Sequence, residues 1–485
     1  MNKRFILTAI LLASVYFTRA QESVSYSLAQ LVQMAQEQSP ASKQAITRKE
    51  NRYWSYRTFK ANYMPQLSLN GTLPNYNRSI LPITQQDGSQ LFREVSQSTA
   101  SAGLSLSQNI GLTGGQIFVN SQIQRIDNFS PVANSSYSAT PASVGFRQPI
   151  FAFNSLVWDK RIEPIRYEES LKEYAENMES IARNVSDLYF NLLLAQISYE
   201  IAEKNVANND TLYKIAEGRY NLGKIAENEL LQLELSLMNA RQSLAQADLD
   251  VQTFSQRLRA YIGVKDAQNI TLLLPENTPD FSVDETLALS EARKNRSRIL
   301  AMKREKLEAD RDVAQARGDN GLNADLFASF GLTQQATVVP DLYVNPQDQQ
   351  QIRIGFSVPI VDWGRSRSSI RTAQANRDMV YATLEQEEVN FDQEVFIQVK
   401  QFQMLRTQLA VAEKSDEIAQ KRYAISKSRY QIGKISITDL NIATQEKDQA
   451  KQAYVQALRS FWTAYYNLRL LTLYDFEKGQ TISYP

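Results

Sequence analysis

The sequence predicts a helix-dominated chain with an internal structural repeat, in which strands join a membrane β-barrel and very long helices form an α-helical barrel. Three observations lead to this fold class. A segment is duplicated, two clusters of residues alternate between apolar and polar, and two long stretches have helical periodicity. Each half has the same order of elements, namely helix, strands, very long helix, turn and helix.

The duplication is visible in two pairs of motifs. Residues 144–150 (VGFRQPI) recur at 354–360 (IGFSVPI), and residues 219–225 (RYNLGKI) recur at 429–435 (RYQIGKI). Both pairs are separated by the same offset of 210 residues. A whole strand-to-helix segment has therefore been repeated without a gap.

The N-terminus is expected to be a secretory signal, residues 1–20. Lys3 and Arg4 precede an apolar stretch of 13 residues at 5–17, which is shorter than the roughly 20 residues that span a bilayer. Cleavage is expected after Ala20, and an uncleaved anchor is the less favoured alternative. No other run of about 18 apolar residues occurs, so no transmembrane helix is predicted for the mature chain.

Composition excludes several kinds of function. The chain has no Cys and no His, which rules out disulfides, a lipid-anchored Cys, Ser-His or Cys-His nucleophiles and the usual zinc sites. We expect no cofactor and no metal. The formal net charge of +1 gives no reason to expect a nucleic-acid partner.

The first helix is expected within residues 21–64, and strands follow it at 65–150. Alternation is clear in this cluster, where Leu67, Leu69 and Leu73 lie between polar residues. This half holds 47 residues more than the other, which we interpret as an additional hairpin turning at Gly114 and Gly115. The sequence leaves open whether this hairpin widens the barrel from four to six strands per chain or lies outside it.

A helical hairpin is predicted for residues 151–262, with a long helix to about Tyr220 and a return helix from about Glu229. A helix of about 65 residues would be about 100 Å long. Gly223 is expected just beyond the long helix in the left-handed conformation, and Asn228 is expected to cap the return helix. A non-helical segment follows at 263–282.

The second half repeats this order. A helix is predicted at 283–320, strands at 321–361, a hairpin at 362–472 and a non-helical tail at 473–485. Gly433 and Thr438 are the expected counterparts of Gly223 and Asn228. Apolar residues of the second long helix form a coiled-coil-like seam. The seam consists of Phe391, Val395, Phe402, Leu405 and Leu409.

The number of strands decides between two readings of the sheet. Strict alternation fits a half-buried soluble sheet and a lipid-facing barrel equally well. So few strands cannot close a barrel in one chain, since roughly eight are needed, and exposed edges promote aggregation. A cyclic oligomer that closes one shared barrel, with its helices continuing as a tube, meets both constraints.

The order of elements and the turn motifs resemble the TolC family of outer-membrane efflux channels, over essentially the whole mature chain. The repeated Gly-Phe-x-x-Pro-Ile lies at the strand-to-helix junctions with Pro149 and Pro359. Gln-Ser-Pro (38–40) and Asn-Arg-Ser (295–297) lie late in the first helix of each half. The turns share the pattern Tyr-x-x-Gly-x-Ile-x-x-x-acid-Leu.

The resemblance implies a homotrimer in outer-membrane lipid, with its helices in the periplasm and segments 263–282 and 473–485 at its equator. It implies a passive exit duct for drugs, small molecules or proteins, in a tripartite efflux or type I secretion system. The implied partners are a periplasmic adaptor protein and an inner-membrane transporter of the RND, ABC or MFS type. No catalysis is implied.

The resemblance also implies roles for the helical turns. Tyr430 matches a gate residue, and Glu229 and Asp439 match acidic positions at the periplasmic tip. The adaptor-docking turns match Gly223, Lys224, Ile225, Gly433, Lys434 and Ile435. An Arg of the family's closed state falls on Ile435, and a second acidic ring would fall on Ile442, so this chain departs from both. Asp439 and Glu229 have an alternative role in stabilising a helix N-terminus.

Two other functions compete with the duct. One is a structural coiled-coil protein of the cell envelope without transport activity, and the other is a carboxylate-based hydrolase. The hydrolase is disfavoured, because a glycosidase needs two acids in one cleft. The exported substrate, the particular pump and adaptor, and the selectivity of the lumen are left open.

Overall fold

The computed structural model describes residues 24–85, 87–264, 270–275, 278–432 and 434–484. The predicted signal (1–20) and Gly433 therefore lie outside the described residues. The chain divides into two compact units. Among the described residues, those within 24–50, 170–299 and 388–484 form the first unit, and those within 51–169 and 300–387 form the second. None of the described helices combines the length and apolar character needed to cross a bilayer.

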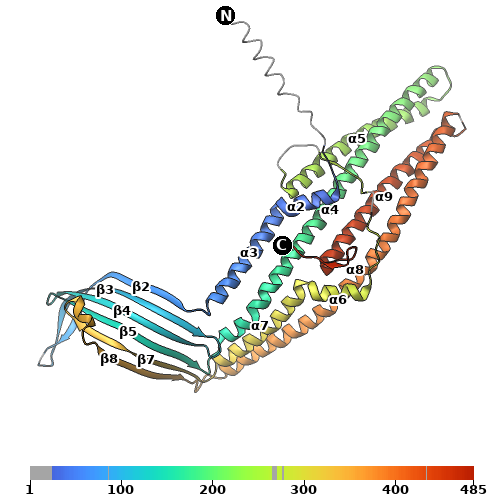
Figure 1. The fold of residues 1–485 in the computed structure, drawn as a ribbon. Helices are drawn as coiled ribbons and strands as arrows, with labels where there is room; N and C mark the ends of the chain where they lie inside the picture. The colour runs from blue at the N-terminus through green and yellow to red at the C-terminus, as the bar shows by residue number, and fades with distance from the viewer. Residues whose placement is uncertain (1–23, 86, 265–269, 276–277, 433, 485) are drawn as a thin grey trace, which may run out of the picture. The chain divides into compact units, whose positions relative to one another are not determined.

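The second unit contains one antiparallel sheet of six strands in the order β2-β3-β4-β5-β7-β8 (Figure 1). The strands are β2 (Gln66–Thr84), β3 (Gln90–Ile110), β4 (Gly115–Ser130), β5 (Asn134–Ile150), β7 (Asn323–Ala336) and β8 (Gln347–Ser357). A short 3-10 helix, η2 (Val339–Tyr343), connects β7 to β8. The additional hairpin, formed by β3 and β4, lies inside this sheet, so that the sheet has six strands and not four.

The two faces of this sheet differ sharply in polarity. On one face a row of apolar residues crosses five strands, each residue opposite the next. This row consists of Leu67, Leu106, Val119, Val144 and Phe330. On the other face the neighbouring row is small or polar. It consists of Ser68, Ser105, Asn120, Ser143 and Gly331. Alternation along each strand thus separates an apolar face from a polar face across the whole sheet.

The strands at the two edges, β2 and β8, are paired on one side only. Their apolar side chains are largely exposed, for example Leu69 at 74% and Phe356 at 80%. Strand edges with free N–H and C=O groups are ready to pair with another strand. Both edges of this sheet are therefore incomplete within one chain.

The two long hairpins have identical helix lengths. Helices α4 (Ser155–Asn221) and α8 (Arg365–Gln431) have 67 residues each, and helices α5 (Glu227–Ile262) and α9 (Ile437–Thr472) have 36 each. Pro164 is accommodated inside α4. The duplication seen in the sequence is therefore also present in the structure, since corresponding helices have equal lengths and begin 210 residues apart.

The shorter helices before each strand cluster are broken, whereas the sequence predicted continuous ones. Helix α2 (Leu28–Gln38) is followed by α3 (Pro40–Ala61), and α6 (Glu285–Asn295) by α7 (Ser297–Asp319). Ser39 is extended because a residue before proline avoids the helical region. The second break, at Arg296, has a different cause. The backbone N–H and hydroxyl of Ser297 donate to the Glu176 carboxylate at 2.7 and 2.9 Å, which caps α7.

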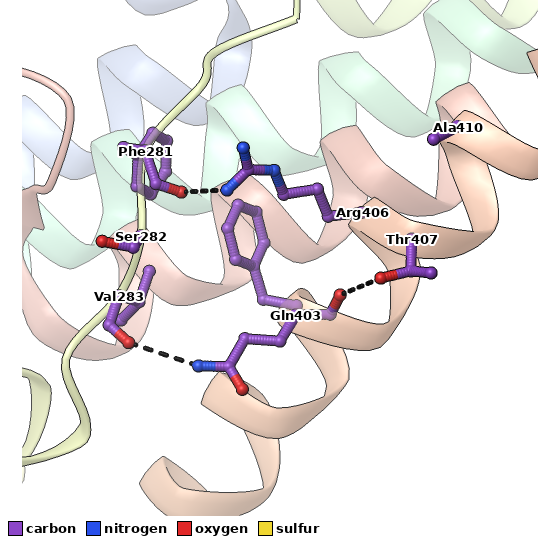
Figure 2. Close-up of a pocket in the computed structure, with 8 residues that line it drawn as sticks. Phe281, Ser282, Val283, Gln403, Arg406, Thr407 and Ala410 are labelled. Carbon is purple, nitrogen blue, oxygen red and sulfur yellow. Dashed lines mark hydrogen bonds between the residues drawn. The ribbon is translucent and has the colours of Figure 1, made fainter.

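The non-helical segments pack on the helices of the first unit. Strand β1 (Val24–Tyr26) pairs with β6 (Ile270–Leu272), and β9 (Tyr474–Asp475) pairs with β10 (Gln480–Thr481). Figure 2 shows the segment before α6 on α8. Arg406 donates to the carbonyl of Phe281 at 2.9 Å, and Gln403 to that of Val283 at 3.3 Å.

The predicted seam of α8 lies in the core of the first unit. Phe391, Val395, Phe402 and Leu409 are buried, and Leu405 is partly buried. The core is completed by side chains from α2, α4, α6 and α9. Phe402 illustrates the packing, with ring centroids 5.4 Å from Phe461 and 5.3 Å from Phe281. Apolar burial is thus concentrated where the hairpins meet the short helices.

Candidate functional site

The turn at the end of α4 has the geometry that its sequence motif predicts. Gly223 has φ +66°, and no atom lies within 4 Å of the position that a Cβ would take there. The Gly223 amide donates to the carbonyl of Tyr220 and the Lys224 amide to that of Arg219, each at 2.8 Å. This is a Schellman motif, which satisfies two carbonyls at the helix end. Lys224 is exposed, and Ile225 is half-buried.

The turn at the end of α8 repeats the second of these bonds. The Lys434 amide donates to the carbonyl of Arg429 at 2.9 Å. Lys434 is exposed, and Ile435 is half-buried. Tyr430, on the last turn of α8, is also half-buried. The two turns therefore share this backbone hydrogen bond as well as their sequence motif.

The caps of the return helices differ from the prediction. Helix α9 is capped by Ser436, not Thr438, and α5 begins after Ala226, whose side chain cannot cap, so Asn228 lies inside the first turn. The predicted caps Asn228 and Thr438 each lie two residues after the observed N-cap.

Asp439 forms a capping box with Ser436. The Ser436 hydroxyl and backbone N–H donate to its carboxylate at 2.7 and 3.1 Å, and the Asp439 N–H donates to the Ser436 hydroxyl at 3.2 Å. The hydroxyl bond, and then the N–H bond, lower the pKa of Asp439 below its ordinary value. Asp439 therefore serves the helix N-terminus, one of the two roles expected for it.

Glu229 is different. It lies exposed in the first turn of α5, and within the described part of the chain its carboxylate has no hydrogen bond or ion pair. The two tip acids are thus unequal, since Asp439 is bonded to Ser436 and, among the described residues, Glu229 has no such partner. The structure shows no bond between Tyr430 and either acid among the described residues.

A groove of about 460 Å³ lies beside Asp439, between α8 and α9. Basic and apolar side chains line it, including Lys421, Arg422, Arg429 and Ile435. The Arg422 guanidinium forms an ion pair with Glu446. The surroundings of Asp439 are therefore basic within one chain.

The two strand-to-helix junctions place their prolines differently. Pro149 lies inside β5 opposite Asp325, whereas Pro359 lies in the loop that follows β8. Each junction also carries an exposed aromatic residue with positive φ, Phe151 (φ +65°, 70% exposed) and Trp363 (φ +55°, 96% exposed). These two aromatics were not predicted from the sequence, although Phe151 directly follows the repeated motif and Trp363 lies three residues after it.

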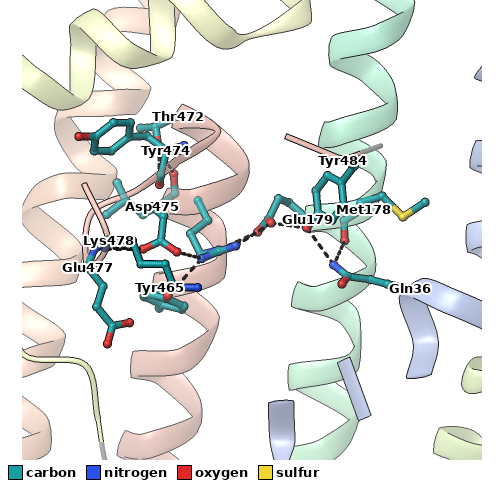
Figure 3. Close-up of polar contacts among 12 residues, drawn as sticks. Gln36, Met178, Glu179, Tyr465, Thr472, Tyr474, Asp475, Glu477, Lys478 and Tyr484 are labelled. Carbon is teal, nitrogen blue, oxygen red and sulfur yellow. Dashed lines mark hydrogen bonds and ion pairs between the residues drawn. The ribbon is translucent and has the colours of Figure 1, made fainter. Parts of the chain in front are cut away.

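A buried polar cluster links α9, α4, α2 and the C-terminal tail (Figure 3). The Arg469 guanidinium binds both oxygens of Glu179 at 2.9 Å, and donates to Asp475 at 2.7 Å. Tyr484 donates to Glu179 at 2.6 Å and accepts from Gln36 at 3.0 Å. Burial, and then the charge of Glu179, raise the pKa of Tyr484 well above its ordinary value, so its hydroxyl remains a donor.

The described residues contain no cluster of three or more His, Cys, Asp or Glu side chains that could hold a metal ion. Buried acids instead form ion pairs with arginines, such as Glu169 with Arg304 at 2.7 Å and Glu179 with Arg469. These pairs connect helices within one unit. Their arrangement is that of structural ion pairs.

Comparisons with known proteins cover most of the chain. Residues 31–264 and 288–472 match a family model described as outer membrane efflux protein. No curated protein matches the sequence.

Several solved structures share the fold. The CmeC outer membrane channel of Campylobacter jejuni is 17% identical, with a TM-score of 0.68 over 94% of this chain and 87% of that chain. A membrane protein from Pseudomonas aeruginosa is 16% identical, with a TM-score of 0.66 over 95% and 94%. The MtrE outer membrane channel of Neisseria gonorrhoeae, in its open state, is 16% identical, with a TM-score of 0.59 over 92% and 88%.

Proposed function

The chain belongs to the outer membrane efflux protein family, and from this premise we propose that three copies form the exit duct of a tripartite efflux or type I secretion system. The chain is an outer-membrane channel, with strands in a membrane barrel and helices in the periplasm. Channels of this kind work with periplasmic adaptors and inner-membrane pumps. We propose that this chain catalyses no reaction and exports drugs, other small molecules or proteins passively.

The observation that carries this proposal is the incomplete sheet. Its apolar face is continuous across the strands but largely exposed, and neither edge strand is paired on its outer side. An apolar face of this kind suits outer-membrane lipid, and the polar face then lines an aqueous lumen. Because β2 and β8 are antiparallel to each other, β8 of one copy can pair with β2 of the next. Three copies of the six-stranded sheet would close a barrel of eighteen strands.

The helices support the same assembly. Exposed apolar residues recur on α8 at intervals of seven, ending just past the helix. They are Ile397, Met404, Val411, Ile418, Ile425 and Ile432. At an offset of 210 residues, the positions Leu194, Ile201, Asn208, Ile215 and Leu222 form a weaker stripe along α4 and its turn, in which Leu194 and Ile201 are half-buried and Asn208 is polar. A period of seven is the pattern of a helix that packs along another helix. We assign these stripes to helices of neighbouring copies in a homotrimer.

The helical turns are the proposed periplasmic tip. Tyr430, Asp439 and Glu229 would surround the entrance, where rings of acids favour cations. The docking turns would bind the adaptor through Gly223, Lys224, Ile225, Gly433, Lys434 and Ile435. Exposed apolar side chains beside these turns, Leu222 and Ile432, fit such a contact. The adaptor would connect the duct to an inner-membrane transporter of the RND, ABC or MFS type.

Fractionation and deletion test the duct together. We expect detergent extracts of outer membranes to contain a heat-resistant trimer that forms ion-conducting channels in planar bilayers. Deletion should lower the tolerance of the cell to antibiotics or abolish export of a protein, without loss of a hydrolytic activity. A soluble monomer in the periplasmic fraction would contradict the proposal and favour a structural envelope protein.

A further inference from the structure

The polar face of the sheet carries an unusual cluster near the ends of the strands that connect to the helices. Three residues lie opposite one another on adjacent strands, Arg147 on β5, Phe327 on β7 and Arg353 on β8. The guanidinium carbons of Arg147 and Arg353 lie 5.9 and 5.4 Å from the centroid of the Phe327 ring. Two cations therefore flank one aromatic ring, within cation–π range.

A second aromatic ring extends this cluster. Phe118 of β4 packs against Phe327, with ring centroids 5.8 Å apart and an angle of 23° between the ring planes. The ring of Phe118 lies directly against Gly145 of β5. A Cβ atom on Gly145 would be only 2.1 Å from the tip of the Phe118 ring. The glycine of the repeated motif therefore allows the two rings to meet. Phe118 and Phe327 remain only half-buried.

The charges around the rings are unbalanced. Within the described part of the chain, neither Arg147 nor Arg353 has an ion-pair partner. Of the two carboxylates on β7 and β8, Asp325 shares this face two residues from Phe327, and Asp348 lies on the opposite face. Asp325 itself makes no ion pair with a described residue. Three copies would contribute six arginines and three aspartates, which leaves an excess of positive charge.

From this geometry we propose that Phe118, Arg147, Phe327 and Arg353 bind anionic solutes that carry an aromatic ring as they pass through the barrel. The proposal rests on the assignment of the polar face to the lumen. Each guanidinium offers five N–H donors that suit a carboxylate or sulfonate, and the accessible part of the two half-buried rings offers a stacking surface. Arginine rings of this kind favour anions in pores. The cluster would thus give the exit a preference opposite in sign to that of an acidic entrance.

Current block in planar bilayers tests this site from the barrel side, without passage through the helical tip. Naphthalenesulfonate is the probe, and methanesulfonate, with the same charged group but no ring, is the comparison. We expect naphthalenesulfonate to block the wild-type channel at lower concentrations than methanesulfonate does. The double variant Arg147→Gln/Arg353→Gln should need about tenfold more naphthalenesulfonate for half-block.

Two further variants separate the contributions. Phe327→Leu should reduce the difference between the two sulfonates while the channel keeps its preference for anions over cations at the barrel. Arg78→Gln is the matched control, because it removes one exposed arginine on the opposite face, where Arg78 is paired with Glu94 at 2.7 Å. It should leave the block unchanged.

Equal block of the wild type and the double variant by naphthalenesulfonate would contradict the proposed site. So would an effect of Arg78→Gln as large as that of the double variant. In that outcome Phe118 and Phe327 are packing residues only. Absence of any channel current, in contrast, would count against the duct itself. Preserved current with unchanged block would leave the duct standing and reject this inference.

Discussion

At the scale of single residues, Arg469 joins two carboxylates in the first unit, those of Glu179 and Asp475. Glu179 is fully buried, and the side chain of Arg469 is 17% exposed. Burial alone would lower the pKa of Arg469, but the hydrogen bonds and charge of Glu179 raise it, so the guanidinium stays charged. A buried pair of this kind is costly to break, because removal of one partner leaves the other without compensation.

We therefore expect Glu179→Gln to destabilise the protein by about 3 kcal/mol. The helical circular-dichroism signal of the solubilised protein should be lost at a lower temperature than in the wild type. Asp392→Asn is the control, since it breaks an exposed pair with Arg293 and should cost less than about 1 kcal/mol. Equal shifts in the two variants would mean that the cluster contributes no more than a surface ion pair.

Residue roles were predictable from sequence only where backbone geometry fixes them. Gly223 was predicted to be left-handed, and it is, because few other residues adopt that conformation. Ser436 was missed as the cap, since Thr438 lies two residues later and is also a residue type that commonly caps helices. Arg147 and Phe327 could not be paired, because strand register joins residues 180 positions apart.

At the scale of elements, Asp439 in the turn between α8 and α9 belongs both to a helix cap and to the proposed gate. Asp439 accepts from Ser436 within the capping box. Its lowered pKa means that the carboxylate stays ionised at a lower pH than an ordinary aspartate. The negative charge of Asp439, and with it the cap, is therefore fully present above the ordinary pKa of an aspartate. Both are lost as the pH falls through the lowered pKa of Asp439.

Two substitutions separate these roles. Asp439→Asn removes the charge, whereas Ser436→Ala removes the cap and keeps the carboxylate. We expect Asp439→Asn to reduce the preference of the channel for cations about twofold, and Ser436→Ala to leave it unchanged. In the wild type, the share of the cation preference that Asp439 contributes should persist to a lower pH than an ordinary aspartate would allow. Tyr430→Ala should raise single-channel conductance, with Tyr220→Ala, its repeat counterpart, as control. If ion selectivity and conductance are unchanged in Asp439→Asn and Tyr430→Ala, the gating role is rejected.

Elements were more predictable than single residues. Repeated motifs at a constant offset predicted equal hairpins, because two copies of one sequence pattern fold alike. The breaks at Ser39 and Arg296 were missed. A proline signals the first, but the second depends on Glu176 of α4, which is distant in sequence. The sequence also left open whether the sheet has four or six strands. Alternation shows which residues of a strand share a face, but it does not show which strands are neighbours.

At the scale of the whole molecule, the free edges of β2 and β8 determine how copies associate. If β8 of each copy pairs with β2 of the next, the contact is heterologous, and three such contacts close a ring. If instead like edges pair, the contact is isologous and stops at a dimer. A closed antiparallel barrel needs an even number of strands, a condition that eighteen satisfies.

Cysteine cross-linking distinguishes these arrangements, because the native chain has no cysteine. We expect a chain with Leu69→Cys on β2 and a second cysteine on β8, tested in turn at Gln350, Ile352 and Ile354, to give covalent trimers with a short thiol cross-linker. These positions share the apolar face. Either cysteine alone should give no cross-linked dimer, since like edges would not meet. Dimers from Leu69→Cys alone would contradict the ring, and with it the shared barrel on which the duct depends.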